Sequence, residues 1–337
     1  MNMTEWKKSI CTNPKRSALP IMTHPGLTII GKKVIDAVSN GEVHFNAIRA
    51  LDDRYPDSSA AVNCLMDLSV EAECFGSQIN FSENDLPTVT GRIVYDEVTV
   101  RSLKVPQLNT GRIPHYLNAT AMAVKAFHHK PVFAGCIGPF SLAGRLYDIS
   151  EIMTAVYEEP DTILLLLQKC TSLLRDYITA FKNTGANGVI MAEPAAGLLS
   201  ADLCDTFSSN FIRTIVSEVQ DETFAVMLHN CGNTGQVTQS VISTGAAMLH
   251  FGNNVDMVQT LHEVPDDRIV LGNLDPVGVM KMQRPEEVYA STLELLTATR
   301  GFPNFVISTG CDTPPGVPFE NINAFYQAVR DFNGNLW

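Results

Sequence analysis

Short apolar runs rich in β-branched residues alternate with longer helical patterns along most of this 337-residue chain. Sustained alternation of this kind indicates a parallel sheet, because parallel neighbours are joined by crossover connections that are usually helical. Eight such units in one chain favour a closed (β/α)8 barrel, although the alternation also fits an open doubly wound sheet. The strand candidates are residues 18–24, 59–68, 130–140, 187–194, 223–232, 246–252, 268–274 and 304–310.

The helical patterns and the stretches between them predict one α/β domain. A polar, turn-rich stretch over 78–112 is expected to form an insertion after the second strand. No low-complexity tract or flexible linker divides the chain, so we expect a single barrel domain over 18–337 with an N-terminal extension over 1–17. The helices expected around the sheet include 69–76, 114–128, 160–184, 200–219, 236–244, 285–299 and 320–331.

Charge and composition exclude several classes of partner. The formal net charge of −12 argues against nucleic acid, because phosphate binding requires lysine and arginine. No apolar run approaches the roughly 20 residues that span a bilayer, and the N-terminus lacks a secretory pattern, so no membrane association is expected. The eight cysteines are irregularly spaced, which predicts a cytoplasmic protein whose clustered cysteine and histidine serve metal binding or catalysis.

Polar residues gather where the predicted strands end. In a barrel, the carboxyl ends of the strands form the rim on which active sites are built. We therefore expect the functional site among the polar residues at these ends. They are His24, Asp67, Glu193, His229 with Cys231, Asn253, Asn273 with Asp275, and Cys311 with Asp312.

His229 and Cys231 are two residues apart, so both side chains can face the same side of a strand. They are either incidental polar atoms in a packed core or two ligands of a metal ion. Cys311, at the end of the last predicted strand, offers a third donor on the same rim. One histidine and two cysteines suit zinc with a fourth position open, but the spacing alone leaves both interpretations open. Cysteines within apolar patterns, such as Cys64 and Cys204, are expected to be buried core residues.

Several spaced motifs together resemble the uroporphyrinogen decarboxylase superfamily. They are "MDLSVEAECFG" (66–76), "GCIGPFSLAGRL" (135–146), "EPAAGLLSADL" (193–203), "HNCGNT" (229–234), "GNLDP" (272–276) and "GCDTPPGVPFENINAF" (310–325). Within this superfamily, His-x-Cys followed by a distant Cys resembles the corrinoid-dependent methyltransferase branch. The resemblance implies a (β/α)8 barrel with zinc at its carboxyl-terminal mouth, held by His229, Cys231 and Cys311.

The resemblance also implies a reaction. A methyl group would pass from a methyl-corrinoid, such as methylcobalamin carried by a partner corrinoid protein, to a thiol activated by zinc, such as coenzyme M or homocysteine. Asp67 and Glu193 are the candidate catalytic carboxylates, and three rim residues are the candidates for orienting the thiol: Asn233, Asn273 and Asp275. The alternatives are a tetrapyrrole decarboxylase and a non-catalytic zinc- or corrinoid-binding subunit.

Two departures bear on these alternatives. The decarboxylases grip substrate carboxylates with an arginine-rich N-terminal motif, but here no arginine stands between Arg16 and Arg49. Their key aspartate aligns with Asp67. Some methyltransferases of the branch use an acidic fourth zinc ligand after strand six, but "HFGNNVDM" (250–257) has no acid before Asp256. The fourth ligand could then be water, His250 or Glu193.

Overall fold

A computed structural model describes residues 1–232 and 235–334. Seven parallel strands form one curled sheet in the order β1, β4, β5, β6, β7, β8, β9, and β2 pairs with β3 in a separate antiparallel hairpin. The strands are β1 (Val62–Asn63), β2 (Gln78–Asn80), β3 (Thr88–Thr90), β4 (Val132–Ile137), β5 (Gly188–Ala192), β6 (Ala225–Asn230), β7 (Met248–Phe251), β8 (Ile269–Leu274) and β9 (Phe305–Thr309).

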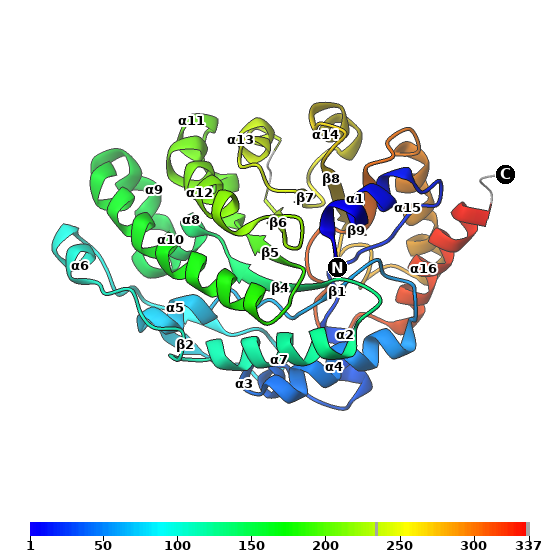
Figure 1. The fold of residues 1–337 in the computed structure, drawn as a ribbon, viewed down its shortest axis with the longest axis horizontal. Coiled ribbons are helices and arrows are strands. Elements are labelled where there is room, and N and C mark those ends of the chain that lie inside the picture. Colours follow the sequence, from blue (N-terminus) through cyan, green and yellow to red (C-terminus); the bar gives the residue numbers. More distant parts are fainter. Residues whose placement is uncertain (233–234, 335–337) are drawn as a thin grey trace.

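Helices surround this sheet on its outer side (Figure 1). They are α1 (Met3–Thr12), α2 (His24–Ile29), α3 (Val34–Ser39), α4 (Gly41–Arg54), α5 (Val70–Phe75), α6 (Glu97–Ser102), α7 (Ile113–Ala126), α8 (Pro139–Tyr147), α9 (Ile149–Glu158), α10 (Pro160–Asn183), the 3-10 helix η1 (Pro194–Leu198), α11 (Ala201–Cys204), the π-helical turn η2 (Asp205–Ser209), α12 (Asn210–Val219), α13 (Thr238–Ser243), α14 (Met257–Glu263), α15 (Pro285–Ala298) and α16 (Phe319–Gly334).

An extended segment closes the sheet into a barrel at the place of the eighth strand. Ala18 forms a parallel bridge with Ile307 of β9, and its carbonyl accepts a hydrogen bond from Ala60 just before β1. The predicted (β/α)8 fold is therefore confirmed. The predicted strand over 18–24 was wrong in its extent, because regular pairing is confined to the bridge at Ala18 and His24 already begins α2.

Two apolar layers hold the barrel together. Alternate strand residues point inward and form one buried cluster, which includes Leu19, Phe133, Met227 and Val306. The residues between them face outward and pack against the helices in a larger cluster. The barrel is thus filled by side chains and is not a pore.

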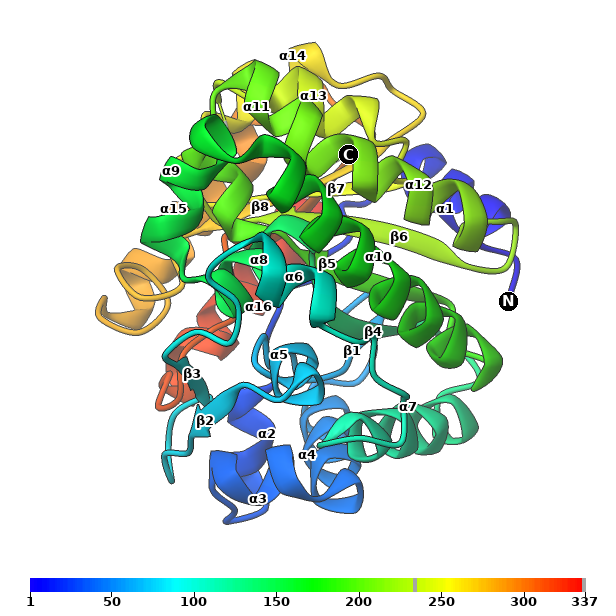
Figure 2. The same ribbon diagram turned by 90° about the vertical axis from the view of Figure 1, so that its left-hand side faces the viewer.

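The two ends of the barrel are covered differently. At the amino-terminal end, Met3 and Trp6 of α1 pack on the inner cluster, and the Met3 amide bonds to the carbonyl of Glu222 just before β6. The β2–β3 hairpin lies at the opposite end from α1 (Figure 2). This hairpin and α6 lie within the insertion expected over 78–112.

Among the described residues, none of the helices has the length and apolar character to cross a membrane.

Candidate metal centre

His229, Cys231 and Cys311 come together at the carboxyl-terminal mouth of the barrel. His229 is the second-last residue of β6, Cys231 follows the end of β6, and Cys311 lies two residues after β9. One ligand atom from each side chain lies within 4.8 Å of the others. Across residues 1–232 and 235–334, no other three His, Cys, Asp or Glu side chains are grouped in this way. The structure therefore brings together the three residues predicted as metal ligands.

The imidazole of His229 is buried and held from one side only. Its Nδ1 lies 2.8 Å from Nδ1 of His250, and the two rings meet nearly at right angles. The other nitrogen, Nε2, is buried and has no hydrogen-bond partner within the described part of the chain. An unpaired buried ring nitrogen is costly unless a further atom meets it. One ring nitrogen of His229 and the sulfur atoms of Cys231 and Cys311 form an N, S, S donor set.

The two thiols interact with each other. Both cysteines are half-buried and neither forms a disulfide. A hydrogen bond from Cys311 lowers the pKa of the Cys231 thiol, and the same interaction raises the pKa of Cys311. One thiolate is therefore readily formed, whereas ionising the second requires a compensating positive charge.

Gly252 lets the loop after β7 pack directly against Cys231. A Cβ atom at Gly252 would lie 2.6 Å from the backbone oxygen of Cys231, which is closer than real Cβ atoms come. The Gly252 amide also donates to the carbonyl of Asn230, so this close approach fixes the backbone at Asn230 and Cys231.

This donor set fits zinc. Histidine nitrogen and cysteine sulfur are typical zinc ligands, and three protein ligands leave one position open as in catalytic sites. Of the two protein side chains considered as a fourth ligand, His250 uses both ring nitrogens elsewhere, because its Nε2 lies 2.9 Å from Ser308 Oγ.

The structure does not bring Glu193, predicted as catalytic, into this group. Its Oε1 accepts hydrogen bonds from the amides of Phe140 and Ser141 in the first turn of α8 and from Ser208 Oγ. Burial raises the pKa of Glu193 to about 8. Gly138 is required beside it, because a Cβ there would lie 1.7 Å from Glu193 Oε2. Glu193 therefore caps α8 from the neighbouring strand.

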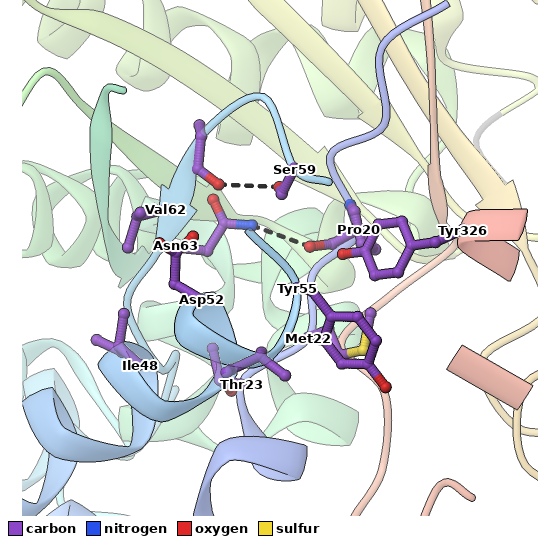
Figure 3. Close-up of a pocket in the computed structure, with 12 residues that line it drawn as sticks. Pro20, Met22, Thr23, Ile48, Asp52, Tyr55, Ser59, Val62, Asn63 and Tyr326 are labelled. Atoms are coloured by element: carbon purple, nitrogen blue, oxygen red, sulfur yellow. Dashed lines mark hydrogen bonds between the residues drawn. The ribbon is translucent and has the colours of Figure 1, made fainter. Parts of the chain in front are cut away.

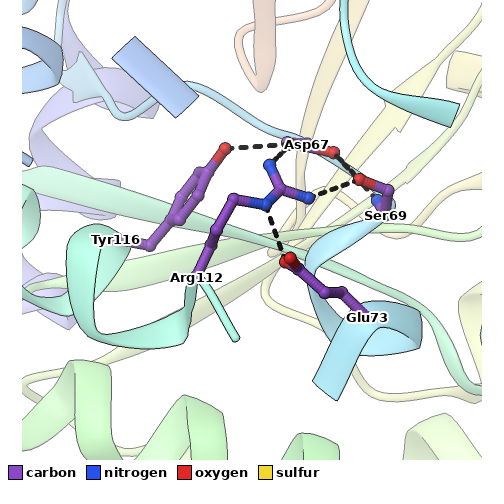
Figure 4. A network of polar contacts seen from close by, with 5 residues as sticks. All are labelled: Asp67, Ser69, Glu73, Arg112 and Tyr116. Carbon is purple, nitrogen blue, oxygen red and sulfur yellow. Dashed lines mark hydrogen bonds and ion pairs between the residues drawn. The ribbon is translucent and has the colours of Figure 1, made fainter. Parts of the chain in front are cut away.

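Asp67 is also engaged away from the three ligands (Figure 4). Its Oδ2 pairs with the guanidinium of Arg112 and accepts a 3.1 Å hydrogen bond from the Tyr116 hydroxyl, while its Oδ1 accepts from the amide and hydroxyl of Ser69. Arg112 also reaches Glu73 of α5 at 2.7 Å. The Asp67 side chain is fully buried, so both carboxylate oxygens are used inside the protein.

The predicted substrate residues have internal partners or lie outside the described residues. Asn273 donates to the carbonyls of Gly252 and Val255. Asp275 accepts from the amides of Val277 and Gly278 and so caps the turn after β8. Asn233 lies outside the described residues. For Asn273 and Asp275, binding of substrate stays a prediction.

A small cavity of about 50 Å³ lies elsewhere, between α4, α16 and the segments around Pro20 and Asn63 (Figure 3). The Asn63 side chain donates to the Pro20 carbonyl across it. None of the predicted site residues lines this cavity.

Sequence reasoning missed the residues that support the candidate site. Ser308 was not singled out, and His250 was considered only as a ligand. The signal was present for both, because His229, His250 and Ser308 fall on inward-facing positions near the ends of their strands. Arg112 was missed because it lies at the end of the insertion, where the sequence shows no periodic pattern.

Curated relatives carry two kinds of name. Methylcobamide:CoM methyltransferase MtbA of Methanosarcina mazei is 26% identical over 276 residues, which cover 81% of this chain and 80% of that protein. A methylated-thiol–coenzyme M methyltransferase of the same organism is 25% identical over 268 residues, covering 79% and 71%. A uroporphyrinogen decarboxylase of Coxiella burnetii is 27% identical over 244 residues, covering 69% and 67%.

A solved methyltransferase structure from Methanosarcina mazei superposes on this chain with a TM-score of 0.88, covering 98% of this chain and 99% of that one. At 21% sequence identity this likeness shows the shared fold. The family model described as uroporphyrinogen decarboxylase (URO-D) matches residues 16–332, nearly the whole barrel. The chain therefore belongs to the uroporphyrinogen decarboxylase family.

Proposed function

We propose that this protein is a zinc-dependent methyltransferase that moves a methyl group from a methyl-corrinoid to a small thiol. The observation that carries the proposal is the group of His229, Cys231 and Cys311, whose donor atoms lie within 4.8 Å of one another at the barrel mouth. The buried Nε2 of His229 supports it, because this atom has no hydrogen-bond partner among the described residues and a metal ion would satisfy it.

The three side chains and a bound Zn²⁺ would together form a site with no net charge. Two thiolates and one neutral imidazole balance the charge of Zn²⁺. When bound here, zinc would lower the pKa of a substrate thiol from its usual value of roughly 8.5, so that the thiolate forms near neutral pH. The thiol proton leaves to solvent. Because this site would carry no net positive charge, the bound substrate sulfur would stay electron-rich.

The transfer itself is a displacement at carbon. The thiolate sulfur attacks the methyl carbon of the methyl-corrinoid, a carbon–sulfur bond forms, and the carbon–cobalt bond breaks with both electrons remaining on cobalt. The products are a methyl thioether and a Co(I) corrinoid. A separate corrinoid protein is proposed as the carrier of the donor, because the name of one relative includes a methylcobamide.

The names of two relatives support this class of reaction, since both are named as coenzyme M methyltransferases. Coenzyme M is therefore the first acceptor to test, and homocysteine is the second. Decarboxylation is less well supported, because Asp67, to which the resemblance assigns the role of the decarboxylases' key aspartate, is fully buried against Arg112.

The experiment compares the wild type with Cys311→Ala. Elemental analysis of the purified wild type is expected to find about one zinc ion per chain, and methylcobalamin should lose its methyl group when a suitable thiol is added. Cys311→Ala removes one of three protein ligands, so it should lose most of the zinc and the thiol-dependent spectral change.

Cys11→Ala is the matched control, because Cys11 is also half-buried but lies on α1 at the other end of the barrel. It should keep both zinc and activity. Absence of zinc from the wild type would overturn the proposal. Zinc without methyl transfer to any thiol in a panel would favour the non-catalytic binding subunit.

A further inference from the structure

We infer that His250 and Ser308 are positioning residues that hold His229 in the tautomer whose Nε2 is free to bind metal. The inference rests on the proposed metal site. It concerns a chain of buried hydrogen bonds that begins at the Leu19 carbonyl and ends at the His229 ring.

The direction of the first bonds follows from the groups involved. Leu19 contributes a carbonyl oxygen, which can only accept, so the Ser308 hydroxyl must donate across their 2.8 Å contact. The hydroxyl has one hydrogen, and it is now used. At the 2.9 Å contact with His250, Ser308 Oγ must therefore accept a hydrogen bond from Nε2–H of His250.

The remaining bond sets the state of His229. A neutral imidazole with its hydrogen on Nε2 has a lone pair on Nδ1, so His250 Nδ1 accepts. His229 Nδ1 must then donate across the 2.8 Å contact, which leaves a lone pair on His229 Nε2. That nitrogen is buried and has no hydrogen-bond partner within residues 1–232 and 235–334, and His229 contributes one ring nitrogen to the group formed with the two sulfur atoms. This chain of hydrogen bonds from Leu19 through Ser308 and His250 to His229 is called the relay below. It leaves the lone pair of His229 Nε2 available to bind a metal ion before the ion is present.

Because the three side chains are buried, each can satisfy its hydrogen bonds only through the others or through the backbone. His229 and His250 are each 1% exposed and Ser308 is fully buried, so water has no access with which to replace a missing partner. The relay also joins the elements that carry the ligands. Ser308 lies on β9 three residues before Cys311, and His229 lies two residues before Cys231. Its loss should therefore affect metal binding more than folding.

The test compares two variants of similar shape, His250→Asn and His250→Leu. The Asn carbonyl oxygen can take the place of Nδ1 and accept from His229, whereas Leu offers no acceptor. We expect His250→Leu to weaken zinc binding by about 10- to 100-fold and His250→Asn to recover a large part of that loss. Zinc affinity is measured on the zinc-loaded proteins by competition with a chromophoric chelator, and thermal unfolding is followed in parallel.

Two further variants separate positioning from packing. Ser308→Ala leaves His250 free to adopt either tautomer, so it should also weaken zinc binding, by less than His250→Leu. His44→Leu removes another buried histidine, whose Nε2 accepts from the Leu65 amide away from the site; it should lower the thermal midpoint but not the zinc affinity.

Equal zinc affinity for His250→Asn and His250→Leu would overturn the inference while leaving the proposed function intact. A wild type without zinc would instead remove the proposed function itself. Retention of wild-type zinc affinity by Ser308→Ala would likewise count against the relay.

Discussion

Two groups of buried polar residues use their polar atoms in different ways. His229, His250 and Ser308 are linked to one another, and Nε2 of His229 is left without a hydrogen-bond partner in the part of the chain that the structure describes. Glu71 and Glu193 instead spend one carboxylate oxygen each on backbone amides around the start of α8. The other oxygen of each carboxyl group is buried and has no hydrogen-bond partner among the described residues, but neither glutamate belongs to the donor group of His229, Cys231 and Cys311. Both glutamates stabilise the place where β4 passes into a helix.

Glu71 makes stability depend on pH in a predictable direction. Burial raises its pKa from 4.5 to about 8. Between these values the folded protein keeps a proton that the unfolded chain releases, so the free energy of unfolding falls as pH rises. The fall attributable to one such group approaches about 1.4 kcal/mol per pH unit. Glu71→Gln should remove this share of the slope, as measured by urea unfolding at several pH values from about 5 to 8.

The control is Glu294→Gln, because Glu294 is exposed on α15. This variant should keep the wild-type slope. Part of the slope should also survive in Glu71→Gln, since the pKa of Glu193 is raised to about 8 as well. A wild type and a Glu71→Gln variant with parallel pH profiles would show that Glu71 does not titrate in this range.

At the scale of elements, one arginine ties the insertion to the barrel. Arg112 lies at the start of α7 and reaches Asp67 beyond β1, Ser69, and Glu73 of α5. Its guanidinium carbon also lies 5.0 Å from the ring centre of Phe81, next to the β2–β3 hairpin. Four segments therefore depend on one side chain.

Arg112→Met should be strongly destabilising because it leaves the buried Asp67 carboxylate without its counter-charge. Breaking a buried ion pair from one side costs about 3–5 kcal/mol. Adding Asp67→Asn to this variant removes the stranded charge and should recover part of the loss. The measurement is the free energy of unfolding of the wild type and of both variants.

Arg101→Met provides the comparison, since Arg101 pairs with Glu97 on the exposed surface of α6. Its effect should stay within about 0.5 kcal/mol. If Arg112→Met were as mild as Arg101→Met, Asp67 would not depend on the ion pair.

Elements with one strong pattern were predictable and those without it were not. The helix predicted over 160–184 is α10, because a Pro–Asp start and a regular apolar stripe define it. Helices α2 and α3 were not predicted because six residues each are too few to show such a stripe. Helix α4 was also missed, although its buried residues between Gly41 and Ile48 recur at helical spacing. These three helices pack on one another, and α3 and α4 pack on α7. The apolar strand cores were predicted well. The segment over 18–24 was taken for a full strand because its composition cannot reveal that Thr23 and His24 turn away into a helix.

For the whole molecule, the two ends of the barrel have separate roles. The carboxyl-terminal end carries the candidate ligands, whose meeting could be predicted because all three lie at or just beyond the carboxyl ends of barrel strands. The partners of Asp67 and Glu193 could not be predicted, because they come from α7 and α8 and depend on three-dimensional packing. The amino-terminal end carries α1, which covers the inner cluster.

This separation predicts that a substitution at the amino-terminal end of the barrel should lower stability without changing zinc binding at the carboxyl-terminal end. Trp6 of α1 is half-buried, and its ring centre lies 6.2 Å from that of Phe133 inside the barrel. Trp6→Ala should cost about 2 kcal/mol, less than for a fully buried aromatic residue, because part of the ring already meets solvent. Tyr157→Ala, at an exposed position on α9, should change stability little. Both variants should hold as much zinc as the wild type under folding conditions. Urea unfolding and elemental analysis of the same samples test this prediction. Loss of zinc from folded Trp6→Ala would mean that the two ends of the barrel are coupled through its interior.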